Sequence, residues 1–400
     1  MQTSGLYVQV PFCAAKCSFC NFSSKVAQHG ELDAYFHALL REIELLEQPI
    51  SCEIAASGLP RLPINTIYFG GGTPTLLGAD RIEELIGRLA QRFQILPDSE
   101  FTVEVAPGST DSRMLDRLKK CGVNRLSIGA QSFDDRELRS VGRLHGADET
   151  RELLRQARDA GFANISLDLI AGLPHQTESS WRANLEATTS LAPEHVSIYI
   201  FEADGRSRLG QETIRHGKRY SAAALPDDEF MAAAYEQARR ALASEGYAQY
   251  EISNFALHGY ASKHNLKYWR REPYWGLGAG AHSFDGARRW SNLSDTAAYA
   301  QSVLSGTRPI AESRVLDLDE SVEEFFFLGL RQSEGVDLGW ARARWGAGRL
   351  APWLEVISEL ASDGWLECEG DRTRLAERAY LISNEIFERF LLAGAAPLAS

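Results

Sequence analysis

Three cysteines near the start of the chain, Cys13, Cys17 and Cys20, are separated by three and then by two residues. Thiolates spaced in this way on one loop can wrap a single [4Fe-4S] cluster, which usually takes four protein ligands. With only three, one iron keeps exchangeable positions that S-adenosylmethionine (SAM) can occupy through its amino and carboxylate groups. An electron passed from the reduced cluster to the sulfonium would release methionine and a 5′-deoxyadenosyl radical. The spacing therefore predicts a cluster with an open iron, and SAM as its ligand.

Two simpler interpretations of the same cysteines are weaker. Structural zinc sites take four ligands and usually pair two knuckles, and no second Cys/His knuckle is visible in the sequence. A redox dithiol would need only two cysteines. The other cysteines, Cys52, Cys121 and Cys368, are scattered, which argues against a disulfide framework. We therefore expect free thiols in a reducing, cytoplasmic environment.

Glycine residues follow the second predicted strand, in the run Gly70-Gly71-Gly72-Thr73-Pro74. Without Cβ atoms, this backbone can approach the amino-acid part of a ligand closely. The structural alternative is a tight strand-to-helix turn. Because the run comes one βα unit after the cysteine loop, we favour a ligand contact.

Polar side chains recur where later predicted strands end: Glu104 ends the third, Gln131 follows the fourth, and Asp168 lies in the fifth. A buried carboxylate needs partners. Ribose hydroxyls, an ammonium group or Arg143 could supply them, and purely structural ion pairs are the alternative. The pattern predicts a polar ligand site at this edge of the sheet.

The elements that must position these residues are repeated βα units, because short β-rich runs alternate with longer helical patterns from Gly5 onward. The predicted strands are 6–10, 66–70, 101–105, 125–129, 166–170 and 196–201. The predicted helices are 32–46, 79–93, 112–119, 148–160 and 178–190. Six units do not close an eight-stranded barrel. We expect an α/β fold, a partial (β/α)6 TIM-like barrel, with ligands at the carboxyl ends of its strands.

The composition excludes some classes of partner. The net charge of -12 argues against nucleic acid or an anionic membrane surface, since both reward clustered Lys and Arg. No stretch approaches the roughly 18 apolar residues of a membrane span, and no signal-peptide core precedes Cys13. We expect a cytoplasmic protein without an integral membrane segment.

Together, these motifs resemble the oxygen-independent coproporphyrinogen III oxidase family of radical SAM proteins, and within it the haem-chaperone branch. The resemblance covers nearly the whole chain. It rests on YVQVPFC at 7–13, GGGTP at 70–74, NRLSIGAQSF at 124–133, GRLH at 142–145, DLIAGLP at 168–174, YEISNF at 250–255 and GLGAGAH at 276–282. It implies a partial radical SAM barrel. It also implies SAM contacts at Tyr7, Phe19, Gly71, Gly72, Thr73, Glu104, Gln131, Arg143 and Asp168.

Departures from the family pattern separate its branches. The oxidases have a further cysteine two residues after the third ligand, where this chain has Phe22. They also carry an N-terminal extension, whereas here the first strand begins within a few residues. Ala106 stands where an asparagine is more usual, which affects only the contact at the third strand. Phe22 and the short N-terminus favour the chaperone branch.

The segment His264-Asn265-Leu266-Lys267-Tyr268 matches the His-Asn-x-x-Tyr motif that the chaperone branch associates with haem. An imidazole can be an axial iron ligand, and Tyr268, Trp269, Tyr274 and Trp275 offer apolar faces to a porphyrin. Packing or hydrogen bonding is the alternative for such a histidine. We expect a haem-related role for His264 and Tyr268, and leave open which side chain touches the iron.

The domain organisation follows from a change of pattern along the chain. We predict a radical SAM partial barrel over 1–203, and a barrel-completing region with the haem motif over 204–315. Helices at 321–332, 338–344 and 350–362 and a hairpin at 365–369 and 373–375 suggest a winged-helix-like domain over 316–400. Its richness in Glu and Asp makes DNA a poor partner, so an interaction or lid role is preferred.

The expected function is that of a haem chaperone, which binds haem, a [4Fe-4S] cluster and SAM and passes haem to acceptor proteins, membrane-bound ones included. One alternative is SAM-dependent oxidative decarboxylation of coproporphyrinogen III. Another is a radical SAM methyltransferase with a different substrate. The sequence leaves open the haem acceptor, the cleavage of SAM and any catalytic role, and dimerisation.

Overall fold

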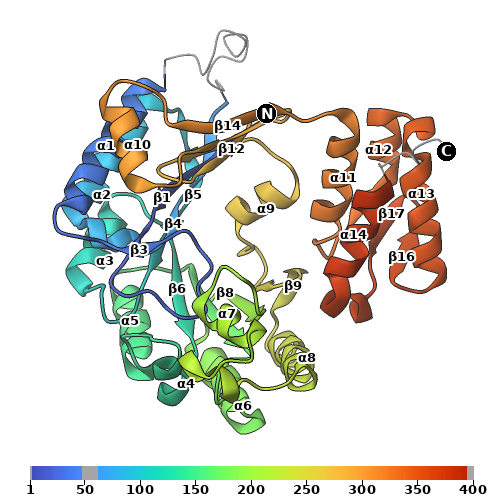
Figure 1. Ribbon diagram of the computed structural model, residues 1–400, viewed down its shortest axis with the longest axis horizontal. Helices are drawn as coiled ribbons and strands as arrows, with labels where there is room; N and C mark the ends of the chain where they lie inside the picture. Colours follow the sequence, from blue (N-terminus) through green and yellow to red (C-terminus); the bar gives the residue numbers. More distant parts are fainter. Residues whose placement is uncertain (1, 47–61, 394–400) are drawn as a thin grey trace.

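The computed structural model describes residues 2–46 and 62–393, and its central feature is a 12-stranded sheet (Figure 1). The strands run in the order β14 (Ile310–Val315), β13 (Arg288–Asn292), β12 (His282–Phe284), β11 (Tyr274–Leu277), β1 (Ser4–Val10), β4 (Ile64–Gly71), β5 (Ile95–Val105), β6 (Arg125–Gln131), β7 (Ile165–Ala171), β8 (His195–Ile200), β10 (Asn254–Ala256) and β9 (Ala248–Glu251). From β11 to β8 all neighbours are parallel, and both edges are extended by antiparallel strands. The six predicted strands are β1 and β4 to β8, so the partial barrel is confirmed.

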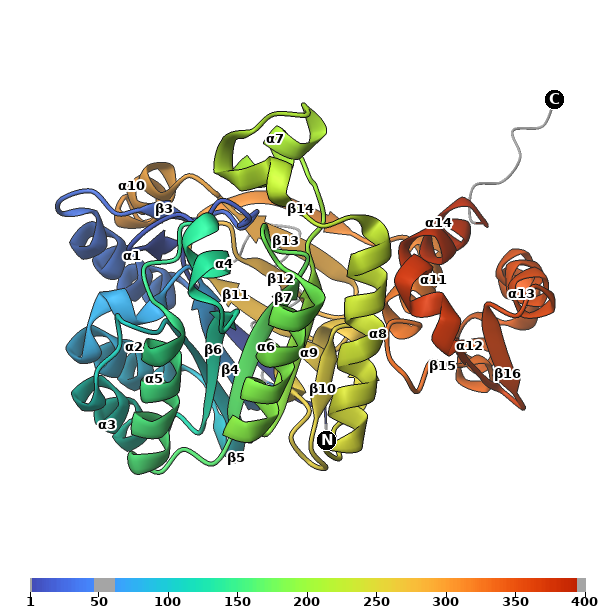
Figure 2. The same ribbon diagram turned by 90° about the horizontal axis from the view of Figure 1, so that it is seen from below.

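Helices cover the outer face of the parallel strands (Figures 1 and 2). They are α1 (Glu31–Leu45), α2 (Ala79–Arg92), α3 (Ser112–Lys120), α4 (Asp135–Ser140), α5 (Ala147–Asp159), α6 (Glu178–Leu191) and α8 (Asp228–Ser244). Shorter elements are β2 (Phe12–Cys13), β3 (Lys25–Val26), the 3-10 helices η1 (Pro74–Leu77) and η2 (Arg219–Ala224), α7 (Arg208–Ile214) and α10 (Thr296–Leu304). The five helices expected between the strands are present, each within one or two residues of its predicted bounds.

Alternate strand residues face two different environments, as the two-residue period of a strand requires. Val8, Phe69 and Val103 join helix residues such as Leu39 and Leu85 in one continuous buried core. The residues between them face the barrel interior and are mostly polar. They include Tyr7 and Gln9, Thr66 and Tyr68, Glu100 and Glu104, Arg125 and Ser127, Ser166 and Asp168, and His195 and Ser197. Closed (β/α)8 barrels usually fill this space with branched apolar side chains, so the polar interior is a departure that needs partners.

The region after residue 203 closes one end of the barrel. Helix α9 (Lys263–Trp269) connects β10, at one edge of the sheet, to β11, on the far side of β1. On its way it passes the amino-terminal ends of the parallel strands, because the N–H groups of Lys263 and His264 donate to the Glu100 carboxylate, both over 3.0 Å. This end of the barrel, covered by α9, is called the base below. The opposite end, where the cysteine loop lies, is called the mouth.

The C-terminal elements stand beside the open side of the sheet (Figure 1). They are α11 (Leu318–Gly329), β15 (Val336–Asp337), α12 (Leu338–Trp345), α13 (Ala347–Ser362), β16 (Leu366–Glu369), β17 (Arg372–Leu375), the 3-10 helix η3 (Glu377–Ile382) and α14 (Ser383–Ala393). The expected helices and hairpin are present, and β15 and α14 were not predicted. Three strands pair as β15-β17-β16. The winged-helix interpretation and the domain boundaries stay predictions.

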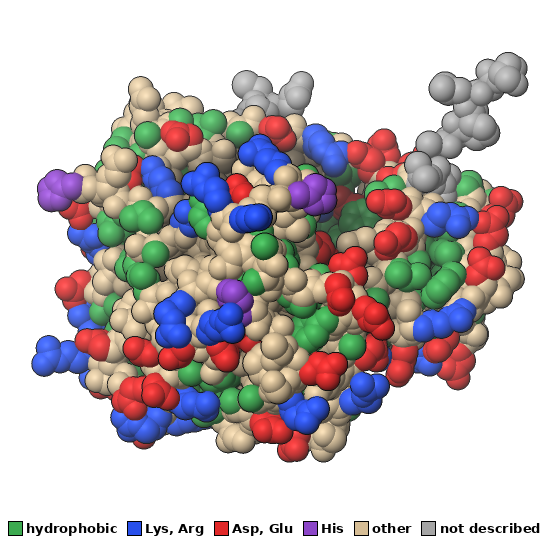
Figure 3. All heavy atoms as spheres, turned by 60° about the horizontal axis from the view of Figure 1, so that its bottom comes forward, with side chains coloured by type: hydrophobic (Ala, Val, Ile, Leu, Met, Phe, Trp, Pro, Cys, Tyr) green, Lys and Arg blue, Asp and Glu red, His purple; other side chains and the backbone are tan. Residues whose placement is uncertain are grey.

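Buried ion pairs attach these elements to the barrel. Glu324 on α11 accepts from Arg271 over 3.1 Å and from Arg289 over 2.6 Å, and Arg331 lies 3.4 Å from the buried Glu251 of β9. Because removing one member of such a pair leaves a buried charge unpaired, these contacts hold the two parts together. Between them the surface is hollowed, with hydrophobic side chains inside the hollow and acidic ones along its edge (Figure 3).

Candidate functional site

The cysteine loop follows β1 at the mouth of the barrel and is tied to its surroundings mostly through the backbone. The N–H of Ser18 donates to the carbonyl of Val141 over 3.0 Å, and the N–H of Leu209 donates to the carbonyl of Ser18 over 2.8 Å. Within the loop, the Lys16 ammonium donates to the carbonyl oxygens of Phe22 and Ser24. The loop thus bridges the end of α4 and the start of α7, which lie above the strand ends in Figure 2.

The three cysteine thiols are free and partly exposed. In the described part of the chain, no three Cys, His, Asp or Glu side chains converge closely enough to hold one metal ion. In a cubane each thiolate binds a different iron, so a spread of thiols on one loop suits a cluster better than a single ion. Burial raises the pKa of Cys13, although the hydroxyls of Ser24 and Thr73 lower it in part. Iron bound in place of the proton would remove that cost.

The glycine run at the end of β4 packs directly against the cysteine loop. The N–H of Gly72 donates to the carbonyl of Val10 over 2.8 Å, and the N–H of Thr73 donates to the carbonyl of Phe12 over 2.7 Å. A Cβ on Gly72 would collide with the Phe12 backbone, and Gly71 has a φ of 107°, which favours glycine. The run therefore has a structural task, to position the cysteine loop, as well as any contact with a ligand.

Two half-buried carboxyl groups, Glu104 on β5 and Asp168 on β7, lie below the mouth with β6 between their strands. Glu104 accepts from the Tyr68 hydroxyl over 2.9 Å and from the N–H of Gly71 over 3.0 Å. Burial raises the pKa of Glu104 to about 7; the Tyr68 hydrogen bond opposes this rise and the neighbouring Asp168 adds to it. The pKa of Asp168 is also raised, mainly by burial. Such a pair favours a ligand that brings a cation or hydroxyl donors, since either would stabilise the charged carboxylates.

Arg143 and Gln131 complete the mouth opposite the glycine run. Arg143 donates to the carbonyl of Gly129 over 2.6 Å and lies 3.6 Å from the Cys17 sulfur, while its buried Nε has no partner among the described residues. Gln131 has a φ of 68° at an irregularity of the β6–β7 pairing. Left-handed backbone at a residue other than glycine is strained, and such strain concentrates at functional sites. The unpaired Nε–H indicates that Arg143 can donate a hydrogen bond to a ligand bound at the mouth.

The remaining predicted SAM residues lie on both sides of this arrangement. Tyr7 stands level with Tyr68, and their ring centroids are 6.0 Å apart. Phe19 packs against the apolar cluster around Ile170 and Phe201, across the mouth. The nine residues thus gather at or just below the carboxyl ends of β1 and β4 to β7. Their contact with SAM stays a prediction.

Several residues inside the barrel were not anticipated from the sequence. Gln9, which accepts from the Tyr7 hydroxyl, and Tyr68 line the interior. Arg125 is only 2% exposed, and its buried Nε has no hydrogen-bond partner among the described residues. Its charge lowers the pKa values of Glu104 and Asp168. The two-residue period of the strands could have placed all three inside the barrel.

The position that decides between family branches is at the surface. Phe22 lies two residues after Cys20, the third cysteine, and is 67% exposed. Cys121 and Cys368, the other cysteines that the structure describes, lie after α3 and in β16, remote in the fold from the loop. Cys52 lies outside the described residues. The described chain thus offers the loop three cysteines and no fourth.

The haem-motif residues lie at the base, below the mouth, where the His264 ring stacks 5.3 Å from the Tyr68 ring and 6.3 Å from the Tyr7 ring. His264 is 1% exposed, and both of its ring nitrogens are engaged, Nδ1 with the Thr66 hydroxyl at 2.9 Å and Nε2 with the Tyr268 hydroxyl at 2.8 Å. Burial lowers its pKa to about 3, with Lys267 adding to this effect. In this arrangement His264 has no free nitrogen for an iron, so an axial-ligand role would require breaking these bonds, and it stays a prediction.

Comparison with known proteins identifies two families along the chain. Residues 7–187 match the radical SAM superfamily, and residues 316–382 match the HemN C-terminal domain. Among curated relatives, "Heme chaperone HemW" of Bacillus subtilis is 34% identical over 386 residues, covering 96% of this chain and 98% of the relative. The Lactococcus lactis protein of the same name is 32% identical, with coverages of 96% and 97%.

A solved structure extends the comparison to three dimensions. The coproporphyrinogen III oxidase HemN of Escherichia coli superposes with a TM-score of 0.83 at 25% identity, covering 97% of this chain and 90% of that one. The radical SAM family implies a [4Fe-4S] cluster and SAM, which the cysteine loop and the mouth residues fit. No helix among the described residues is long and apolar enough to cross a membrane. On this similarity over nearly its full length, the chain belongs to the HemW family of radical SAM proteins.

Proposed function

We propose that this protein is a haem chaperone that carries a [4Fe-4S] cluster and SAM at the barrel mouth and binds haem as cargo for an acceptor protein. The observation that carries the proposal is the similarity to proteins named heme chaperone over nearly the whole of both chains. The absence of a cysteine at position 22 agrees with it.

The residues at the mouth divide the task of holding SAM between them. Cys13, Cys17 and Cys20 would hold the cluster, whose open iron supplies the electron-transfer chemistry when SAM is bound. Glu104 and Asp168 present carboxyl groups to an ammonium or to ribose hydroxyls. The remaining predicted contacts are Tyr7, Phe19, Gly71, Gly72, Thr73, Gln131 and Arg143.

Arg143 would act on the cluster side of this site. Its guanidinium, 3.6 Å from the Cys17 sulfur, places a fixed positive charge beside a thiolate ligand. A cation there stabilises the thiolate form, and its unpartnered Nε is free to donate to a ligand.

Haem would be cargo, and passing it on requires a site that opens to solvent. His264 and Tyr268, the haem candidates of the motif, are closed within the base. We infer that in this conformation they serve the fold, because their hydrogen bonds link α9 to β4. Haem acceptors, cytoplasmic location and dimerisation belong to the proposal as expectations.

The test is anaerobic reconstitution of the full chain, with iron, SAM cleavage and haem measured on the same sample. We expect about four irons per chain, a saturable haem complex, and transfer of that haem to a haem-free acceptor protein. Absence of saturable haem binding by reconstituted protein would overturn the proposal.

The alternative is the decarboxylase reaction, which the structural likeness to HemN favours. It requires that two propionate side chains of coproporphyrinogen III become vinyl groups, each losing CO2, one hydrogen atom to the SAM-derived radical and one electron to an added acceptor. Incubation of the same sample with SAM, a reductant and coproporphyrinogen III decides between the two. Sustained formation of protoporphyrinogen would establish the oxidase, whereas a chaperone forms none.

A further inference from the structure

A pocket of about 710 Å³ lies between the end of α9, the loop joining β12 to β13, and the C-terminal elements α11 and α12. Its volume falls in the range of pockets that enclose cofactor-sized ligands. None of the residues expected to hold the cluster or SAM lines it. It is therefore a second site, remote from the mouth.

One side of the pocket is aromatic. Phe325 and Trp340 stack with ring centroids 5.3 Å apart and planes 24° apart, and Trp345 meets both edge-on. Trp340 is nevertheless 52% exposed. Trp269, the last residue of α9, also lines the pocket, and its buried indole N–H has no partner among the described residues. Exposed stacked rings of this kind bind flat π-systems.

The pocket also carries positive charge that its surroundings neutralise only in part. Arg271 donates from Nε to Glu324, but its buried Nη2 has no acceptor among the described residues. Arg344 and Arg372, which also line the pocket, make no ion pair in the described part of the chain. Burial lowers the pKa of Arg271, and the charge of Arg344 lowers it further, although Glu324 opposes both. Two neighbouring guanidinium groups of this kind favour an anion between them.

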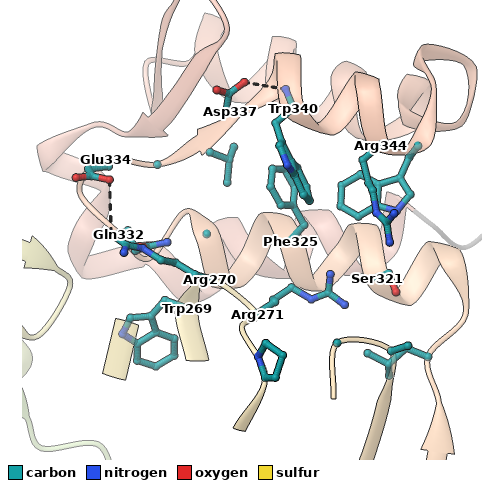
Figure 4. A pocket seen from close by; sticks show the side chains of 18 of the residues that line it. Trp269, Arg270, Arg271, Ser321, Phe325, Gln332, Glu334, Asp337, Trp340 and Arg344 are labelled. Atoms are coloured by element: carbon teal, nitrogen blue, oxygen red, sulfur yellow. Dashed lines mark hydrogen bonds and ion pairs between the residues drawn. The ribbon is translucent and has the colours of Figure 1, made fainter. Parts of the chain in front are cut away.

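Two carboxylates line the pocket, those of Glu334 and Asp337. Figure 4 shows Arg271 and Arg344 near Ser321, with Glu334 at the opposite side of the view. Glu334 lies 3.9 Å from Arg270, and Asp337 is engaged as the cap of α12, accepting from the N–H of Trp340 over 2.9 Å. Arg271 and Arg344 are thus separated from Glu334, and the Asp337 carboxylate already accepts a backbone N–H. A ligand with both a flat ring and carboxylates would match the aromatic and cationic features together.

We propose that this pocket binds the haem cargo, with the porphyrin ring against Trp340 and Phe325 and the propionates at Arg271 and Arg344. The inference rests on the proposed chaperone function and deepens it, because it places the cargo at the junction with the C-terminal elements instead of at His264. Cargo held there could leave without opening the barrel, since Trp340 and Arg344 are already exposed. Trp269 directly follows the haem motif, so the motif helix contributes to the site through its final residue.

The test is a titration of cluster-reconstituted full chain with haem, followed by quenching of tryptophan fluorescence. Three tryptophans line the pocket, so bound haem should quench them strongly. Arg344→Glu and Trp340→Ala should each weaken haem binding by about tenfold or more. Arg342→Glu is the matched control, because it makes the same charge change on the same helix, outside the pocket lining, and it should change affinity by less than about twofold.

Two further ligands test the chemistry of recognition. Metal-free protoporphyrin IX keeps the ring and both propionates, so it should bind within about tenfold of haem, whereas its dimethyl ester should bind at least about tenfold more weakly.

The outcomes separate this inference from the function on which it rests. If wild-type protein bound no haem, the proposed function itself would fail. If it bound haem with unchanged affinity in Arg344→Glu and Trp340→Ala, this pocket would be the wrong site. Loss of binding in His264→Ala, in protein shown by circular dichroism to be folded, would then locate haem at the base.

Discussion

The mouth and the base of the barrel are built from the same strands but satisfy their polar groups in opposite ways. At the mouth, the cysteine thiols are free, Arg143 Nε has no partner among the described residues, and Gln131 has left-handed backbone. At the base, both nitrogens of His264 are hydrogen-bonded. Unmet donors and strain persist where a ligand compensates for them, whereas a closed structural contact satisfies its own polar groups.

The comparison bears on the haem motif. A histidine that is fully engaged and buried has the environment of a structural residue, although its sequence context points to haem. The residue that follows the motif, Trp269, reaches a pocket instead. Two positions of α9 therefore have different tasks. His264 stabilises the fold, and Trp269, the last residue of the helix, lines the pocket.

The largest expected effect is at the mouth. Cys17→Ala should abolish the cluster, lowering iron from about four per reconstituted chain to near zero, because two thiolates cannot hold a cubane with an open site. Iron analysis and the visible absorption of the cluster measure it. Cys121→Ala is the matched control, since Cys121 lies after α3, and should keep its iron. Full iron content in Cys17→Ala would show that the loop is not the cluster site.

The next effect is at the base. His264→Ala should lower the free energy of unfolding by about 2–4 kcal/mol, because it leaves a cavity and strips the Thr66 and Tyr268 hydroxyls of their partner. Urea denaturation measures it, with the exposed His258→Ala as control. The haem affinity of folded protein should stay within about twofold of wild type, since the proposed site is elsewhere. A cost below about 0.5 kcal/mol would contradict a structural role for His264.

Between the two ends, Glu104 should make the stability of the SAM-free protein depend on pH. Its folded pKa of about 7 lies above the ordinary glutamate pKa of 4.5, so between these values the folded state binds the extra proton. Stability from this group is therefore present at low pH and is lost as the pH rises toward 7, by at most about 3 kcal/mol. Glu104→Gln should abolish this loss.

The measurement is the difference between wild type and Glu104→Gln in unfolding free energy from pH 5 to 8. The difference is needed because His264, whose pKa is lowered to about 3, contributes a dependence of opposite sign below pH 6.5. Parallel curves for the two proteins would show that the Glu104 carboxyl is not perturbed.

The smallest effects compare single side chains at the two ends. Leu144, 75% exposed at the mouth, should tolerate Leu144→Ser with a change below about 0.5 kcal/mol in SAM-free protein. Tyr268→Phe at the base removes one hydroxyl and leaves His264 Nε2 without its partner, at a cost of about 1–2 kcal/mol. Thermal unfolding of both variants checks the order, and a reversed order would contradict the distinction between the two ends.

Much of the barrel could be predicted from the sequence because its signals are local. The two-residue alternation of β1 and β4 to β8, and the helical periodicity between them, depend on neighbours in the chain. The cysteine loop is equally local, since Cys13, Cys17 and Cys20 lie within eight residues of one another. The glycine run and Glu104 could be placed at the strand ends because parallel strands bring their carboxyl ends to one edge.

What only the tertiary structure decided depends on contacts between distant segments. His264 meets Thr66 across 198 residues, and no local pattern shows that α9 crosses the base instead of the mouth. The buried Arg125 and the pocket formed by α9, α11 and α12 likewise arise when separate elements pack. The sequence by itself determined the cluster loop and the barrel, because both follow from spacing along the chain. Packing decided which polar side chains are buried with hydrogen-bond partners and which stay accessible to a ligand, because burial depends on the whole folded chain.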